Sequence, residues 1–384
     1  MAVLILVVGL VLLAAGGESL VRGASSLART IGMSSLMVGL TVVSFATSAP
    51  ELAVSAGAVF SGHPSLAVGN VLGSNIANVL LVLGLSALFT PLIVRSRIVR
   101  TDIPVMVALS TGLLLVVLDG TLSRFDGALL LMALLAYVTV TVIVTRRDPG
   151  VSVPAPATAD SPVGAKTEPV HGAGARPGRL VIALVLVALG VALLVVGARL
   201  LVDAAGEIAA ALGVSDLVIG LTVVAVGTSL PELATSVVAV IRGERDLAVG
   251  NIVGSNMFNI GFVLGATSIV APQGIDVAPA VIRFDLPIML AVSLALLPVA
   301  FTGLTVARWE GALFVGYYGA YIGYLALEAT GHDALQPYSA AMLWFVVPLT
   351  ALWLTLLATH ELSLGSSRRE GGRPEPERPG AGER

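Results

Sequence analysis

The stretches TSAPEL, Thr47–Leu52, and TSLPEL, Thr228–Leu233, each place a proline and a glutamate inside a run of apolar residues. Neither residue suits the middle of an apolar helix, because proline removes a backbone donor and an ionised carboxylate is costly to bury. The two stretches lie 181 residues apart and differ at one position. Any account of the fold must therefore explain why the chain carries this pair of residues twice.

The composition predicts an integral membrane protein. Of 384 residues, 56% are hydrophobic and 12% are charged, whereas ordinary soluble domains carry about 25% charged residues. The absence of cysteine excludes disulfides, thiolate metal sites and thiol catalysis. A net charge of -3 gives no sign of a nucleic-acid partner. The sequence has no GxxxxGK[ST] motif, so neither ATP nor any other resident cofactor is expected.

Apolar runs long enough to cross the hydrocarbon core, about 20 residues each, predict eleven spans. The first begins at the N-terminus, which lacks the positive region of a signal peptide. Residues 146–179 and 359–384 are rich in small and polar residues and predict a disordered cytoplasmic linker and a disordered cytoplasmic tail. The predicted spans are residues 2–20, 36–60, 65–90, 103–118, 126–145, 180–202, 216–241, 247–271, 286–302, 309–328 and 338–358.

Basic residues are distributed unevenly over the predicted loops. If the N-terminus lies outside, 18 Lys and Arg residues fall on the cytoplasmic side, and only Arg124, Arg199 and Arg283 fall outside. Because positive residues concentrate in cytoplasmic loops, the sequence predicts a cell-membrane protein with its N-terminus outside and its C-terminus in the cytoplasm.

Residues 39–84 align with residues 220–265 without gaps, with 27 identities in 46 positions. Thr, Ser, Pro, Glu, Gly and Asn match in register, which apolar bias alone does not produce. Five predicted spans precede the second copy, and an odd number inverts it in the membrane. The predicted fold is therefore an all-α membrane protein. Its ten-helix core is formed by inverted five-helix repeats over 1–145 and 180–328, and 338–358 is an extra C-terminal transmembrane helix.

Glu51 and Glu232 are the only acidic residues that fall well inside predicted spans. A charged side chain at the bilayer centre costs about 2.5–3.5 kcal/mol on insertion scales, so each carboxylate needs a partner. No Lys, Arg or His is predicted at comparable depth. The sequence therefore predicts that the missing partner is a bound cation.

Helical spacing gathers further oxygen atoms beside each glutamate. Residues at i, i+4 and i+8 share a helix face, and two such sets occur: Thr47, Glu51 and Ser55, then Thr228, Glu232 and Ser236. In the spans that follow, a serine and an asparagine are four residues apart, as Ser74 and Asn78 and again as Ser255 and Asn259.

The two prolines are expected to add backbone oxygen to this set. Pro50 and Pro231 have no N–H, so the carbonyls of Ala46 and Gly227 lose their helical partners. Carboxylates, hydroxyls, amide oxygens and freed carbonyls suit hard cations such as Ca²⁺ and Na⁺, whereas Zn²⁺ and Cu⁺ prefer nitrogen or sulfur.

Plainer interpretations apply to several of these residues. A hydroxyl in a membrane helix often bonds only to a carbonyl of its own helix. Glycine at GxxxG spacing often serves only to pack helices, which is our expectation for Gly69, Gly73, Gly250 and Gly254. Asn70 and Asn251 are expected to link helices rather than bind the cation.

On these residues the chain resembles the cation/calcium exchanger superfamily, in particular its prokaryotic Na⁺/Ca²⁺ exchanger branch. The motifs are TSAPEL with GNVLGSNIANVLLVLG, and GTSLPEL with GNIVGSNMFNIGFVLG. The resemblance implies an antiporter that exchanges Na⁺ for Ca²⁺ by alternating access, with the first and sixth helices sliding across the other eight. It implies that Glu51, Glu232, Thr47 and Thr228 bind Ca²⁺ at the midplane, and that Ser48, Ser229, Ser74 and Ser255 form flanking Na⁺ sites.

The chain departs from the family pattern at Asn78 and Asn259, since some members carry an aspartate at one of these positions. Two glutamates alone supply two negative charges, which balance one Ca²⁺ or two Na⁺. The departure leaves the stoichiometry open and argues against potassium coupling. The eleventh span is an addition to the ten-helix plan.

Two other functions are compatible with the scaffold. The glutamates could carry protons, which would couple a divalent cation to H⁺, but the surrounding hydroxyls favour Na⁺ because a proton needs no coordination shell. A passive cation channel fits the repeat less well, because channels more often use rings of carbonyls or charges. An enzyme is not expected, since Ser48 and Ser229 have no buried His or Lys to activate them.

Overall fold

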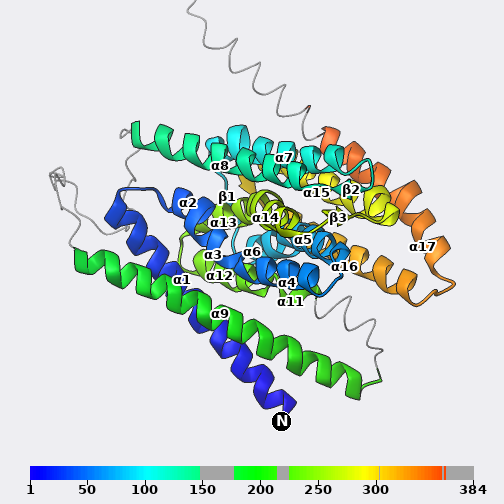
Figure 1. The fold of residues 1–384 in the computed structure, drawn as a ribbon, viewed down its shortest axis with the longest axis horizontal. Coiled ribbons are helices and arrows are strands. Elements are labelled where there is room, and N and C mark those ends of the chain that lie inside the picture. Colours follow the sequence, from blue (N-terminus) through cyan, green and yellow to red (C-terminus); the bar gives the residue numbers. More distant parts are fainter. Residues whose placement is uncertain (148–176, 214–224, 302, 357–358, 360–384) are drawn as a thin grey trace, which may run out of the picture.

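The chain folds into a bundle of long helices in a computed structural model that describes residues 1–147, 177–213, 225–301, 303–356 and 359 (Figure 1). Within these ranges nine helices are long and apolar enough to cross a membrane. They are Ala2–Ile31, Ser35–Phe60, Ser65–Phe89, Ile98–Val116, Arg124–Thr145, Gly178–Ala211, Arg245–Val270, Val281–Phe301 and Leu335–Leu356.

Several of these spans are divided into α-helical and π-helical segments, the latter written η. The first half of the chain contains α1 (Ala2–Ile31), α2 (Ser35–Val38), η1 (Gly39–Val43), α3 (Ser44–Thr47), α4 (Ala49–Phe60), α5 (Ser65–Ala77), η2 (Asn78–Leu83), α6 (Gly84–Phe89), η3 (Ile98–Asp102), α7 (Ile103–Val116) and α8 (Arg124–Arg147). The second half contains α9 (Pro177–Ala211), α11 (Ala225–Gly227), α12 (Leu230–Ile241), α13 (Arg245–Phe258), η5 (Asn259–Leu264), α14 (Gly265–Val270), η6 (Val281–Asp285), α15 (Leu286–Phe301), α16 (Arg308–Ala329), α17 (Leu335–Ala341) and η7 (Met342–Val346).

The helices differ from the predicted spans in two respects. First, α1 and α9 run to 30 and 35 residues, well beyond the predicted 2–20 and 180–202. The apolar run ends at Glu18, but helical residues continue to Ile31, and Gly32 ends the helix in the left-handed conformation. Second, α16 occupies the predicted span 309–328 but is not among the nine apolar helices, because glycine, tyrosine and glutamate interrupt its apolar residues.

Other predictions fall partly on residues outside the described ranges. The predicted span 216–241 is represented by α11 and α12 only, since residues 214–224 are among those not described. Most of the predicted linker and tail lies in 148–176 and 360–384, which are also outside these ranges. An apolar helix, Leu335–Leu356, covers most of the predicted span 338–358.

The most deeply buried spans are Ser65–Phe89 and Arg245–Val270, which carry the GNxxGSN motifs. Figure 1 shows α5, α6, α13 and α14 in the middle of the bundle, with α7 and α8 along one side and α1 and α9 along the other. The buried core includes Leu72, Ile76, Ile252 and Val253 from these central helices. The motif helices are therefore enclosed on both sides by the rest of the bundle.

Two short antiparallel ribbons tie the halves of the chain together. In one, β1 (Leu92–Ile93) pairs with β4 (Thr305–Val306), and in the other β2 (Thr121–Leu122) pairs with β3 (Ile275–Asp276). Each ribbon joins a loop of the first half to a loop of the second. They fix the two halves relative to each other at the ends of the central helices.

The helices α1 and α9 pack against each other along a seam of glycines. A methyl group at Gly190 would lie 2.6 Å from the Leu20 nitrogen and 2.9 Å from the Gly16 oxygen, and one at Gly9 would lie 2.9 Å from the Gly197 oxygen. Glycine at these positions lets the two backbones touch, as small residues do in membrane helix pairs. The seam indicates that α1 and α9 form one rigid pair.

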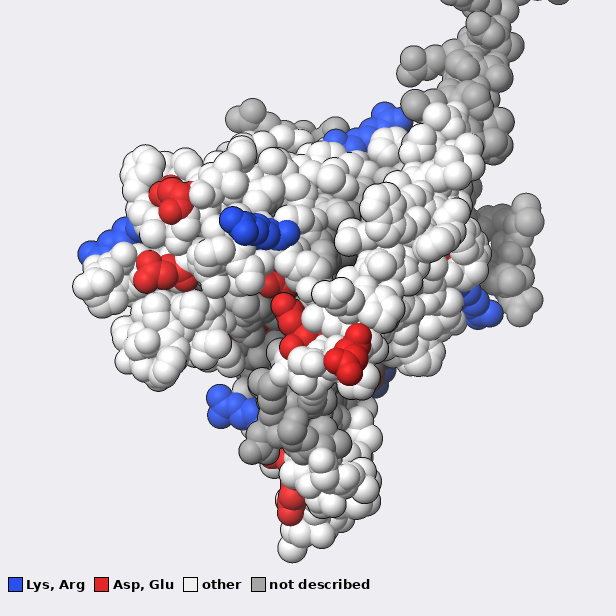
Figure 2. Space-filling view, turned by 90° about the vertical axis from the view of Figure 1, so that its right-hand side faces the viewer, with Lys and Arg blue, Asp and Glu red and all other residues white. Residues whose placement is uncertain are grey.

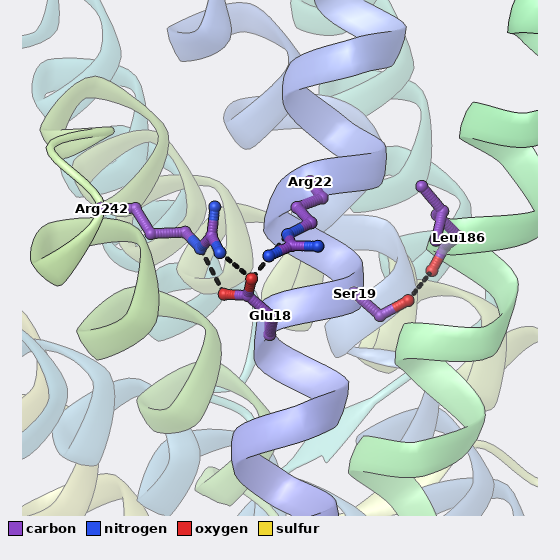
Figure 3. A network of polar contacts seen from close by, with 5 residues as sticks. All are labelled: Glu18, Ser19, Arg22, Leu186 and Arg242. Atoms are coloured by element: carbon purple, nitrogen blue, oxygen red, sulfur yellow. Dashed lines mark hydrogen bonds and ion pairs between the residues drawn. The ribbon is translucent and has the colours of Figure 1, made fainter.

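Polar contacts connect this pair to the core (Figure 3). Glu18 of α1 contacts Arg22 at 2.5 Å and also pairs with Arg242, the residue that ends α12. Ser19 donates a hydrogen bond to the Leu186 carbonyl of α9 at 2.9 Å. Ser25 donates one to Glu244 at 2.9 Å. These contacts hold α1 to α9 and to the end of α12.

We predict that Gly190→Ala lowers the stability of the folded protein. The added methyl group would meet backbone atoms of α1, and overpacking of this kind typically costs about 1–3 kcal/mol. The measurement is the thermal melting temperature of the purified protein in detergent. Gly112→Ala is the matched control, because no atom of the described residues lies within 4 Å of a methyl group there. Equal melting temperatures for the two variants would show that the glycine seam is not a tight contact.

Candidate functional site

The TSAPE stretch breaks its helix in the way that the proline predicts. The helix α3 ends at Thr47, Ser48 has φ and ψ of -78° and 1°, and α4 begins at Ala49 with Pro50 in its first turn. Proline fits the first turn of a helix, where its missing N–H has no partner to lose. The break places Glu51 in the first turn of α4, where the positive end of the helix dipole favours a carboxylate.

The second copy has the same geometry. The helix α11 ends at Gly227, Ser229 has φ and ψ of -86° and 2°, and α12 begins at Leu230 with Pro231 in its first turn. Glu232 therefore also lies in the first turn of a new helix. The two nearly identical motifs thus produce the same kind of helix break in both halves of the chain.

The GNxxGSN helices change their winding at the predicted site residues. Asn78 is the first residue of η2, and Asn259 is the first residue of η5. The π-helical segments cover positions that are equivalent in the two copies. Sequence reasoning did not foresee them. Such segments occur frequently at functional sites.

The structure brings the predicted site residues together from both halves of the chain. Neither Glu51 nor Glu232 has any exposed surface, and Thr228 alone among the ten residues is partly rather than fully buried. The other seven, each at most 1% exposed, are Thr47, Ser48, Ser74, Asn78, Ser229, Ser255 and Asn259.

Hydroxyl groups pair across the two halves. Thr47 shares a hydrogen bond of 3.3 Å with Ser255, and Thr228 shares one of 3.2 Å with Ser74. Each threonine of a TS-x-PE motif therefore meets the serine of the GNxxGSN motif in the other copy. These two pairs of hydroxyls join residues of both copies into one site.

The two carboxylates lie among these hydroxyls. Glu51 lies close enough to Glu232 for their charges to interact. The Ser74 hydroxyl lies near the Glu51 carboxylate, and the hydroxyls of Thr47 and Ser255 lie near that of Glu232. None of the four carboxylate oxygens accepts a hydrogen bond. The three ion pairs formed by the described residues all lie elsewhere. Two buried carboxylates thus lie near each other, with no basic side chain among the described residues to balance them.

Other oxygen atoms at the site also lack partners. The hydroxyls of Ser48 and Ser229, both side-chain polar atoms of Asn78 and the Oδ1 atom of Asn259 make no hydrogen bond. Buried polar atoms are normally paired, so a cluster of unpaired ones requires an explanation. A set consisting almost entirely of oxygen atoms, two of them carboxylates, is able to coordinate a hard cation.

Asn70 and Asn251 link neighbouring helices, as the sequence analysis expects. The Asn70 amide donates to Ser55 at 3.1 Å and to the Glu51 carbonyl at 3.3 Å. The Asn251 amide donates to Ser236 at 3.2 Å. Asn251 also accepts a hydrogen bond of 3.2 Å from Thr47, so it holds a site residue as well.

The expectation that the motif glycines pack helices is confirmed in the second copy. Methyl groups at Gly250 and Gly254 would each lie 2.7 Å from a backbone oxygen, of Leu36 and Leu40 respectively. The residues equivalent to these two leucines in the second copy, 217 and 221, lie outside the described ranges. Methyl groups at Gly69 and Gly73 would meet no neighbouring segment of the described residues within 4 Å.

Sequence reasoning missed Asn75 and Asn256, which lie beside the site. Asn75 accepts a hydrogen bond of 3.1 Å from the Asn259 amide. It also donates one of 3.3 Å to the Asn256 carbonyl. Both residues recur in register in the two copies, and this recurrence was the signal that would have identified them.

The face at one end of the bundle is hollowed. Figure 2 shows the face on the right-hand side of Figure 1, with a hollow at its centre. Acidic side chains lie around and within the hollow, and basic side chains are spread more widely over the face. A negatively lined depression of this kind attracts cations rather than anions.

Comparison with known proteins identifies the family. Residues 1–143 and 182–327 match the family described as sodium/calcium exchanger protein. The inner membrane protein YrbG of Escherichia coli (strain K12) is 40% identical over 297 residues, which is 77% of this chain and 87% of that protein. The sodium/calcium exchanger MaX1 of Methanosarcina acetivorans is 32% identical over 346 residues, which is 83% of this chain and 97% of that protein.

The fold also matches solved structures. The sodium-calcium exchanger NCX_Mj has a TM-score of 0.68 and 32% identity to this chain, over 84% of this chain and 98% of that one. The matched family consists of membrane transporters rather than enzymes. With two matched segments that contain every residue of the candidate site, the chain belongs to the sodium/calcium exchanger family.

Proposed function

We propose that this protein is a secondary-active antiporter that exchanges Na⁺ for Ca²⁺ by alternating access. The observation that carries the proposal is the pair formed by Glu51 and Glu232, buried together without a basic partner. A cation bound between them would supply the missing positive charge. Ca²⁺ and Na⁺ would occupy the same site in turn, because the negative charge of the two carboxylates must be balanced in each state.

The ligands are proposed to be the ten residues at the site. Glu51, Glu232, Thr47 and Thr228 would hold Ca²⁺ at the centre. Ser48, Ser74, Ser229 and Ser255 would hold Na⁺ on either side, and the amide oxygens of Asn78 and Asn259 would complete the set. Ca²⁺ typically takes 6–8 oxygen ligands in flexible geometry, which a ring of carboxylates, hydroxyls and amides provides.

Two inverted repeats, residues 1–145 and 180–328, are proposed to place this site near the membrane midplane. Support comes from the equivalent breaks at Ser48 and Ser229 and from the hydroxyl pairs that join the two copies. Inverted repeats of this kind allow one group of helices to move against the rest of the bundle around a fixed site. The C-terminal helix, residues 338–358, would lie outside this unit, with the linker 146–179 and the tail 359–384 on the cytoplasmic side.

The helix pair α1 and α9 is proposed to be the moving part. The glycine seam joins the two helices, while their contacts with the core are confined to one side of the bundle (Figure 1). Movement of the pair would close the acidic hollow of Figure 2 and open the opposite end. The contact between Glu18 and Arg242 belongs to the conformation shown in Figure 3.

The first prediction for the site concerns transport. Vesicles that contain the purified protein are loaded with Na⁺ and diluted into Na⁺-free buffer, and uptake of radiolabelled Ca²⁺ is followed. Glu51→Gln and Glu232→Gln should each abolish uptake, because one remaining carboxylate cannot balance a divalent cation. Glu310→Gln is the control, since Glu310 is also buried but caps α16 by accepting from the Ala307 amide. Glutamine can cap a helix in the same way.

Other outcomes of the same assay would replace the proposal. Uptake driven equally well by a pH gradient without Na⁺ would assign the coupling to protons carried by the glutamates. Uptake that needs no opposing ion would indicate a channel. Full activity of both glutamine variants would show that the cation binds elsewhere in the protein.

A second prediction follows from the number of charges. Asn78 and Asn259 are neutral, so the two glutamates balance one Ca²⁺ or two Na⁺. Exchange of two Na⁺ for one Ca²⁺ moves no net charge, and the initial rate of uptake should not change when a membrane potential is imposed with K⁺ and valinomycin. Asn259→Asp adds a third negative charge, which balances a third Na⁺. The exchange then moves net charge, and the initial rate of uptake should depend on the membrane potential. A rate that already depends on the potential in the unmodified protein would contradict this count.

A third prediction concerns orientation, which is proposed to be N-terminus outside and C-terminus cytoplasmic, in the cell membrane. The chain has no cysteine, so single cysteines report position directly. Ser61 and Ser96 are both exposed and lie between predicted spans. Ser61→Cys and Ser96→Cys therefore each place one cysteine on one side of the membrane. A membrane-impermeant maleimide added to intact cells should label the first and leave the second unlabelled until the cells are opened. The reverse pattern would invert the proposed topology.

A further inference from the structure

Four buried asparagines occupy equivalent positions in the two GNxxGSN helices. Asn75 lies near the end of α5, about one turn before η2, and Asn78 is the first residue of η2. Asn256 and Asn259 occupy the equivalent positions in α13 and η5. At most 2% of each side chain is exposed. The helix α5 packs against η5, and α13 packs against η2. Each asparagine therefore has the other copy as its neighbour.

The hydrogen bonds in this cluster are not symmetric, although the residues are. Asn75 accepts a hydrogen bond of 3.1 Å from the Nδ2 atom of Asn259. The equivalent bond would run from Nδ2 of Asn78 to Oδ1 of Asn256, and neither atom has a partner. The Nδ2 atom of Asn256 donates to the Ile252 carbonyl of its own helix, at 2.8 Å. One half of the cluster is tied across the repeats and the other half is not.

The bond from Asn259 to Asn75 fixes which way the Asn259 amide faces. A carboxamide has a donor side and an acceptor side, and the donor side of Asn259 is engaged by Asn75. Its Oδ1 atom is then directed away from Asn75 and has no partner. The segment η5, which begins at Asn259, packs against α4, the helix that carries Glu51. The free oxygen is therefore on the first residue of a segment that packs against the helix of Glu51.

We propose that Asn75 is a positioning residue for the cation site, which acts by turning the Asn259 carboxamide so that its oxygen, and not its NH₂ group, faces the cation. In this conformation Asn256 gives Asn78 no such orientation. The proposal rests on the proposed function, because it presupposes that a cation binds beside Glu51 and Glu232. It adds a residue and an asymmetry that the ligand set alone does not contain.

The chemistry of the amide makes this orientation matter. If the Asn259 side chain rotated by half a turn, its NH₂ group would face the cation, and a donor repels a positive charge. An aspartate at this position would offer oxygen in either orientation and would need no such support. The use of a neutral asparagine at 259 is what creates the requirement for an acceptor at Asn75.

Asn75 itself is held in the orientation that this role requires. Its Nδ2 atom donates to the Asn256 carbonyl at 3.3 Å and lies 3.6 Å from the sulfur of Met289. Because the donor side of Asn75 is engaged by a backbone carbonyl, its Oδ1 atom is the one available to Asn259. Two successive hydrogen bonds thus transmit the orientation from the α13 backbone to the site.

The test is equilibrium binding of radiolabelled Ca²⁺ to the full-length protein in detergent without Na⁺. Asn75→Ala should raise the dissociation constant about three- to tenfold, the range expected for one lost hydrogen bond. Asn256→Ala is the matched control, because it removes the equivalent residue from the other copy, and it should leave the constant within twofold. In an Asn259→Ala background, Asn75→Ala should have no further effect, since it acts through Asn259.

Asn75→Asp provides the conservative variant. It keeps an acceptor for the Asn259 amide, so it should bind Ca²⁺ no more weakly than the unmodified protein, even if Asn75→Ala proves too unstable to purify. Thermal melting of each variant separates a loss of binding from a loss of fold.

Several results would overturn the inference. These are unchanged binding in Asn75→Ala, equal effects of Asn75→Ala and Asn256→Ala, additive effects of Asn75→Ala and Asn259→Ala, and weaker binding in a folded Asn75→Asp. If the unmodified protein itself binds no Ca²⁺, the fault lies with the proposed function and not with the role of Asn75 alone.

Discussion

Two carboxylates buried near each other, without a basic residue in the described part of the chain to balance them, are the constraint on which the rest of the site depends. Glu51 and Glu232 are both fully buried, and their four oxygens accept no hydrogen bond. In a low-dielectric interior such a pair repels and loses its hydration. A bound cation relieves both problems, and exchange of one cation for another keeps the pair balanced throughout a transport cycle.

The surrounding structure can be understood as the means of bringing the two carboxylates together. Each glutamate needs a break in its helix, which the proline and the preceding serine provide. Each break must meet the other copy, and the hydroxyl pairs from Thr47 to Ser255 and from Thr228 to Ser74 join the copies. The glycine seam then lets α1 and α9 lie together along one side of the bundle without contributing a ligand.

Local chemistry explains which parts of this structure were predictable. The helix breaks followed from Pro50 and Pro231, and the links made by Asn70 and Asn251 followed from their place beside the site. The length of α1 did not follow, because hydropathy stops at Glu18 while packing on α9 continues. The π-helical starts at Asn78 and Asn259 and the role of Asn75 depend on contacts between distant segments, which no single stretch of sequence contains.

Competition between the two ions tests the central claim most directly. Radiolabelled Ca²⁺ is bound at equilibrium to the purified protein, and Na⁺ is added in increasing concentration with choline as the control cation. If both ions share the glutamate pair, Na⁺ should displace all of the bound Ca²⁺, cooperatively, since two Na⁺ must replace each Ca²⁺, and choline should displace none. Bound Ca²⁺ that persists at saturating Na⁺ would contradict a shared site at Glu51 and Glu232.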